Sequence, residues 1–134
     1  MPTYTGQCHC GANRIVSESM HPLAPRACQC SFCRKHGART VSDPDGSAIL
    51  ELAGDAIRYR FASKAADYLL CGTCGVYLGA VADIDGRTFA TLNLNAFDDP
   101  RPDLVAAPVS YEGESAEAKA LRRRARWTPA RIFS

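Results

Sequence analysis

The chain has 134 residues, of which 46% are hydrophobic and 22% charged, and its formal net charge is +2 at pH 7. This length suits one domain built around a single hydrophobic core. The nearly balanced charge gives no basis for binding nucleic acid or an acidic membrane surface, and no stretch reaches the roughly 20 apolar residues of a membrane span.

The first residues, MPTYTGQCHC, lack the basic and apolar regions of a secretory signal. We therefore expect a cytoplasmic protein, in which clustered cysteines bind metal or take part in chemistry more often than they form disulfides. The odd number of cysteines, seven, also fits a disulfide framework poorly.

Short β-like runs separated by turn signals fill the first hundred residues. We expect strands within residues 14–16, 38–42, 48–52, 56–61, 68–70, 76–81 and 88–94. Alternation is clearest in IRYRF, where Ile57, Tyr59 and Phe61 would share one face of a strand. The Asp-Gly step in DIDG (83–86) predicts a hairpin turn.

The amino-acid composition of the chain changes after residue 103. SAEAKALRRRARW (115–127) predicts one C-terminal helix, with Ser115 as its N-cap and Glu117 in its first turn. The arginines of residues 122–126 favour a solvated helix face over a nucleic-acid surface, and Trp127 is expected to be a packing anchor. The predicted architecture is mostly β with this one helix, in a single domain, residues 1–134.

The cysteines fall into three groups, namely Cys8 and Cys10, then Cys28, Cys30 and Cys33, then Cys71 and Cys74. The last pair lies between two apolar runs as CGTCG, and a strand–CxxCG–strand pattern is typical of a zinc knuckle. Gly75 would take the left-handed conformation that closes the turn. CHCG ends in the same Cys-Gly step, so the first and last pairs are expected to form one site.

Four thiolates fill the coordination shell of Zn²⁺, so Cys8, Cys10, Cys71 and Cys74 predict a structural site. Three thiolates leave one position open, which is how a catalytic zinc differs from a structural one. Cys28, Cys30 and Cys33 are therefore the candidate reactive centre. Two alternatives remain open here: His36 could close the triplet as a fourth ligand, and His9 could join the other site.

The order of the motifs resembles that of the glutathione-dependent formaldehyde-activating enzyme family. The matching blocks are GQCHCG (6–11), CQCSFCRKHG (28–37), CGTCG (71–75) and TLNLNAFDDP (91–100). The resemblance runs from about residue 4 to residue 100. Beyond Pro102 it ends, which leaves residues 101–134 as a divergent helical tail.

The resemblance implies a β-tent-like fold of small zinc-stapled sheets with two zinc ions per chain. It implies a structural zinc on Cys8, Cys10, Cys71 and Cys74, and a catalytic zinc on Cys28, Cys30 and Cys33. The implied activity is that of a carbon–sulfur lyase, which condenses the glutathione thiol with formaldehyde or another small aldehyde, or cleaves such an adduct. The implied partners are thus a small thiol and an aldehyde, with no nucleic acid and no membrane; the oligomeric state is not indicated.

Two questions stay open at the level of sequence. Arg34, Lys35 and Arg39 adjoin the triplet and could meet the carboxylates of glutathione, against the alternative of a solvated basic loop. A tail that covers the second zinc would also change the choice of substrate. The alternative function is a non-catalytic, zinc-stabilised binding module in which both metals are structural.

Overall fold

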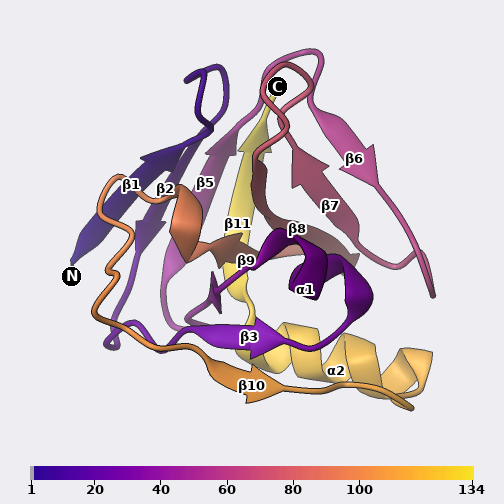
Figure 1. Ribbon diagram of the computed structural model, residues 1–134. Helices are drawn as coiled ribbons and strands as arrows, with labels where there is room; N and C mark the ends of the chain where they lie inside the picture. The colour runs from indigo at the N-terminus through magenta and orange to yellow at the C-terminus, as the bar shows by residue number, and fades with distance from the viewer. Residues whose placement is uncertain (1) are drawn as a thin grey trace.

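The computed structural model describes residues 2–134 and shows a strongly curved β-sheet with a helix packed beneath it (Figure 1). Its strands are β1 (Thr3–Gln7), β2 (Arg14–Glu18), β3 (Arg26–Cys28), β4 (Thr40–Val41), β5 (Ser47–Glu51), β6 (Ile57–Tyr59), β7 (Asp67–Leu70), β8 (Tyr77–Ile84), β9 (Arg87–Asn93), β10 (Ala107–Val109) and β11 (Thr128–Phe133). The helical elements are α1 (Ser31–His36), the 3₁₀ turn η1 (Leu94–Ala96) and α2 (Ala116–Arg126). The prediction of a mostly β protein with a C-terminal helix is confirmed, whereas the short helix α1 was not predicted.

The strands are joined in one pairing network. Its main path runs β1-β2-β5-β11-β9-β4-β3-β10, and a branch leads from β9 through β8 and β7 to β6. β8 and β9 form the predicted hairpin, with Asp85 (φ 54°) and Gly86 (φ 79°) at its turn. Two successive residues with positive φ match the type I′ turn that an Asp-Gly step favours.

The C-terminal part of the chain is built into the sheet. β11 pairs in parallel with β5 and antiparallel with β9, so it lies between two strands made much earlier in the sequence (Figure 1). β10 pairs in parallel with β3. Neither pairing was predicted, because both strands find their partners far away along the chain.

The largest fully buried apolar side chains come from five strands and from η1, and are Ile15, Leu50, Leu69, Leu78, Leu92 and Leu94. β5 shows the alternation expected of a strand with one buried face. β6 differs, because Ile57 and Tyr59 are about half exposed, at 48% and 47%. Of the three residues predicted to share a face, Tyr59 and Phe61 both stack on Phe32, so these two rings cover α1 and not the main core.

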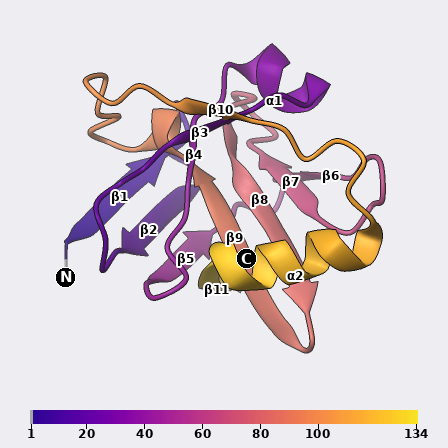
Figure 2. The same cartoon turned by 90° about the horizontal axis from the view of Figure 1, so that it is seen from below.

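Helix α2 lies across β8, β9 and β11 (Figure 2). Ser115 caps it as predicted, because its side chain accepts a hydrogen bond from the Ala118 amide at 3.1 Å. Trp127 is buried among Ala66, Ala80 and Phe89, which confirms it as a packing anchor. None of the helices in residues 2–134 is both long and apolar enough to cross a membrane.

The prediction of a solvated arginine face on α2 is wrong for two of its residues. Arg124 and Arg126 are exposed, but Arg122 is half-buried and Arg123 is only 6% exposed. Arg123 lies four positions before Trp127, and its guanidinium stacks on the Trp127 ring at 4.9 Å from the ring centre. Because residues four apart share one face of a helix, the burial of Trp127 places Arg123 on the buried face of α2 as well.

Candidate metal centres

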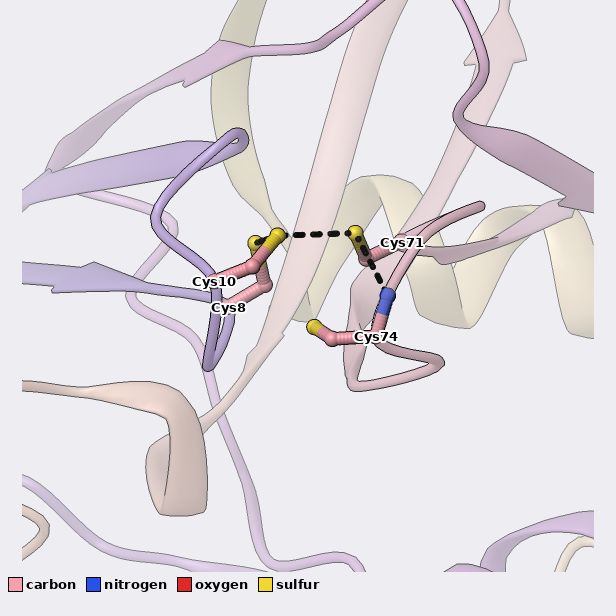
Figure 3. Close-up of side chains that lie close together, drawn as sticks. All are labelled: Cys8, Cys10, Cys71 and Cys74. Atoms are coloured by element: carbon pink, nitrogen blue, oxygen red, sulfur yellow. Dashed lines mark hydrogen bonds between the residues drawn. The ribbon is translucent and has the colours of Figure 1, made fainter.

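The first cysteine cluster joins two turns that are distant in sequence. Cys8 and Cys10 lie between β1 and β2, and Cys71 and Cys74 lie between β7 and β8 (Figure 3). The four Sγ atoms all lie within 4.8 Å of one another, with 3.7 Å between Cys8 and Cys10 and 3.6 Å between Cys10 and Cys71. Zn–S bonds of about 2.3 Å put tetrahedral sulfur ligands about 3.8 Å apart, so this donor set fits Zn²⁺.

The backbone of each turn supports this cluster. Gly11 and Gly75 have φ values of 83° and 82°, which confirms the left-handed conformation predicted for Gly75. The amides of Thr73 and Cys74 each donate to the Cys71 Sγ at 3.3 Å. Such N–H groups stabilise a thiolate over a neutral thiol, as a metal ligand requires.

Hydrogen bonds from Asn13 lower the pKa of Cys8 in this cluster. Burial alone would raise the pKa of Cys8, but hydrogen bonds from the backbone and side-chain amides of Asn13 lower that pKa to about 6. The backbone donor lies 3.3 Å from the Cys8 Sγ. This thiol is therefore mostly ionised at neutral pH.

The second cluster occupies a single short stretch of chain. Cys28 ends β3, Cys30 is the N-cap of α1, and Cys33 lies in the first turn of that helix. Their Sγ atoms also lie within 4.8 Å of one another. Cys33 is buried while Cys28 and Cys30 are half-buried, and the neighbouring Cys33 thiol lowers the pKa of Cys28 to about 5.

Neither histidine alternative receives support from the geometry. Within residues 2–134, the group of mutually close ligand atoms around Cys28 contains three sulfurs and no His36 nitrogen. The His36 ring packs instead against Phe32 and Tyr77, at centroid distances of 4.5 and 5.5 Å. His9 is exposed and belongs to neither cluster.

The triplet opens onto a cavity of about 410 Å³, which is within the range of small-molecule sites. The cavity is lined by Cys28 and Cys30, by residues 61–63, and by Ala65, Ala66 and Tyr68. The remaining wall comes from residues 110–114 and from α2. A smaller cavity of about 50 Å³, the inner cavity, shares Cys28, Tyr68 and Arg123 with the first and is also lined by Cys33.

The three basic residues that adjoin the triplet, for which the sequence left open a role toward the substrate or a solvated loop, are engaged elsewhere or exposed. Arg39 donates to Asn95 Oδ1 at 2.7 Å and to the backbone carbonyls of Arg101 and Leu104 at 3.0 and 2.8 Å, so its guanidinium is occupied by acceptors of the protein itself. Arg34 donates to the Gln29 carbonyl at 2.9 Å, and Lys35 is exposed.

The cations that do line the cavity are Lys119, Arg122 and Arg123, which sequence reasoning missed. The available signal was the spacing of four residues between Arg123 and Trp127. A buried tryptophan brings the residue one helical turn before it to the same face.

A third group of ionisable residues lies at the DPDG turn. The His21 Nε2 and Asp45 Oδ2 atoms are 2.8 Å apart, and Asp43 lies beside them. The buried Asp43 carboxylate already accepts hydrogen bonds from the backbone amides of Met20, His21 and Asp45. These bonds tie the turn to the segment after β2, and this group is accounted for by that structural role.

Comparison with known proteins agrees with the cysteine pattern. The family model of the glutathione-dependent formaldehyde-activating enzymes matches residues 3–111. The chain belongs to this family. The match contains all seven cysteines and ends at Tyr111, so it includes both clusters and excludes α2 and β11.

Two relatives place the family assignment in context. A Halomonas elongata protein, named provisionally as a glutathione-dependent formaldehyde-activating enzyme, is 41% identical over 51 residues. That match covers 38% of this chain and only 29% of the Halomonas protein. A crystal structure of a Rhodobacter sphaeroides protein has a TM-score of 0.60 and 30% sequence identity, and covers 78% of this chain and 97% of that one.

Proposed function

We propose that the protein is a zinc enzyme of the carbon–sulfur lyase type that joins a small thiol, glutathione first among them, to formaldehyde or another small aldehyde, or cleaves such an adduct. The observation that carries the proposal is the three-thiol cluster at the wall of a cavity of about 410 Å³. The family name supports the same chemistry. We further propose that the reaction takes place in the cytoplasm.

In this proposal Cys8, Cys10, Cys71 and Cys74 hold a structural zinc, and Cys28, Cys30 and Cys33 hold a catalytic zinc. A zinc ion bound to three thiolates lowers the pKa of a coordinated thiol or water and polarises a carbonyl oxygen. The three cysteines are then ligands and not nucleophiles. The sulfur that attacks the aldehyde belongs to the substrate.

The reaction forms one carbon–sulfur bond. The thiol loses a proton, its thiolate attacks the aldehyde carbon, and the electron pair of the carbonyl bond moves to oxygen. That oxygen takes up one proton to give a hemithioacetal, which is an S-hydroxymethyl adduct when the aldehyde is formaldehyde. Tyr68 lines the cavity, and burial raises its pKa to about 12, so its hydroxyl stays protonated at neutral pH. A neutral hydroxyl donates a hydrogen bond to the oxygen on which negative charge develops.

The competing function is a binding module in which both metals are structural. It requires a fourth protein ligand at the triplet. Among residues 2–134, no histidine or carboxylate joins the three sulfurs as a fourth close ligand atom, and the His36 ring packs on Phe32 and Tyr77. The enzyme is therefore the better-supported function.

The test measures zinc content together with the rate of adduct formation. We expect about two zinc ions per chain by mass spectrometry of the metal, and faster exchange between ¹³C-formaldehyde and glutathione by NMR than without protein. Cys30→Ser should retain about one zinc and lose the acceleration. Two zinc ions with an unaccelerated exchange would favour the binding module.

A further inference from the structure

We propose that Arg123 of α2 is the receptor for a carboxylate of the thiol substrate, so that thiols that carry a carboxylate are preferred over neutral thiols. This inference rests on the proposed function and deepens it. It names a specificity residue that lies beyond residues 3–111, the range matched by the family model. The choice of thiol would therefore be a property of this chain's own tail.

Arg123 is a buried cation without a counter-ion. Its side chain is 6% exposed, and among residues 2–134 its guanidinium forms no ion pair with any carboxylate and its buried Nε has no hydrogen-bond partner. Burial of an unpaired charge opposes folding unless a partner is supplied. A guanidinium held in this state in a cavity wall therefore indicates an anionic ligand.

The other cations of the cavity wall are less suited to the role. Arg122 forms a bidentate pair with Glu114, at 3.0 to 3.2 Å, and its guanidinium lies 3.5 Å from the centre of the Tyr111 ring. Lys119 lies on the outer part of the wall and does not reach the inner cavity. Arg123 lines both cavities and has one face fixed by the Trp127 ring.

The inner cavity is cationic and lies against the triplet. It is lined by Cys28 and Cys33 and by the guanidinium-bearing residues Arg26, Arg122 and Arg123, and no carboxylate lines it. Arg26 donates to the hydroxyls of Ser42 and Thr91, at 2.7 and 3.1 Å. A thiol whose sulfur reaches the triplet thus brings its nearest substituent toward Arg123, and a carboxylate is the substituent that a guanidinium binds best.

The test compares an acid with its neutral ester on the zinc-loaded protein. Titration calorimetry is carried out with 3-mercaptopropionate and with methyl 3-mercaptopropionate. Because a charge-assisted hydrogen bond is lost with the ester, we expect the wild-type protein to bind the acid about ten- to hundredfold more tightly. Arg123→Met should abolish this preference by weakening the acid alone, and Arg126→Met, at an exposed position of the same helix, should keep it.

The outcomes distinguish an error about Arg123 from an error about the proposed function. Equal affinity of the wild-type protein for acid and ester overturns the role of Arg123. An equal weakening of both ligands in Arg123→Met also overturns it, and would mean that Arg123 acts on the cysteine thiolates and not on the carboxylate. Failure of both thiols to bind the zinc-loaded wild-type protein counts against the proposed function instead. If Arg123→Met does not fold, Arg123→Lys keeps the charge, and we expect it to retain only part of the preference for the acid.

Discussion

At the scale of single residues, the two turns that form the four-thiol cluster depend on a backbone conformation that glycine adopts without strain. Gly75 has φ 82° immediately after Cys74, and its amide donates to the Cys71 carbonyl at 3.0 Å. A side chain at this position would meet no neighbouring atom, so the restriction is one of backbone conformation and not of space. The turn that presents the Cys71 and Cys74 sulfurs is therefore sensitive to a single methyl group.

We expect Gly75→Ala to lower the free energy of unfolding by about 1–2 kcal/mol, because an L-residue with a side chain is strained in the left-handed region. Urea denaturation of the zinc-loaded protein measures this change. Gly54→Ala is the matched control, since Gly54 also has open space around it but no left-handed φ. Equal stabilities for the two variants would contradict the assignment of the strain to Gly75.

At the scale of elements, the C-terminal end of α2 has two roles: it anchors the helix to the sheet and it lines the cavity. Its last turn is fixed to the sheet by Trp127, and its inner face supplies the cavity wall through Arg122 and Arg123. The buried Trp127 contacts side chains of β8 and β9, among them Ala80, Ala82 and Phe89. The position of the arginines is consequently set by the packing of the tryptophan.

Trp127→Ala should lower the free energy of unfolding by about 3–5 kcal/mol, because it leaves a large cavity beneath the helix. Far-UV circular dichroism should follow the unfolding, since the chain has one tryptophan and its fluorescence is lost in the variant. Leu121→Ala, at a 52% exposed position of the same helix, should change stability by less than about 0.5 kcal/mol. A loss in Trp127→Ala no larger than in Leu121→Ala would rule out the anchoring role.

The elements that were predictable are those whose pattern is local. The alternation of residues 48–52 and the Asp-Gly turn at residue 86 are readable from neighbouring residues, and so is the spacing that divides the cysteines. β3 and β10 have only three residues each, and β10 and β11 pair with strands far away along the chain, so local pattern carries little information about them. The same limit applies to the cavity wall, because the identity of the inward arginines depends on how α2 packs on the sheet.

At the scale of the whole molecule, the two cysteine clusters constrain different amounts of structure. The four-thiol cluster links the β1–β2 turn to the β7–β8 turn, which are separated in the strand pairing order as well as in sequence. The triplet lies within residues 28–33 and links β3 only to the adjacent α1. Loss of metal from the first cluster should therefore affect the fold far more than loss from the second.

We expect Cys10→Ser and Cys30→Ser each to reduce zinc content from about two ions per chain to about one. Differential scanning calorimetry should separate them, because Cys10→Ser should lower the Tm by on the order of 10 °C more, which corresponds to a loss of about 3 kcal/mol for a domain of this size. Similar Tm values for the two variants would mean that the four-thiol cluster is not the structural one.

The place of β11 between β5 and β9 has a consequence for how the chain folds during synthesis. All four ligands of the first cluster have been made once translation reaches Cys74, whereas the facing edges of β5 and β9 stay unpaired until residues 128–133 follow. An unpaired edge is a template for pairing with another chain. A ribosome that stalls between these points would thus hold a nascent chain that contains the complete four-thiol cluster and yet still presents two edges on which it can aggregate.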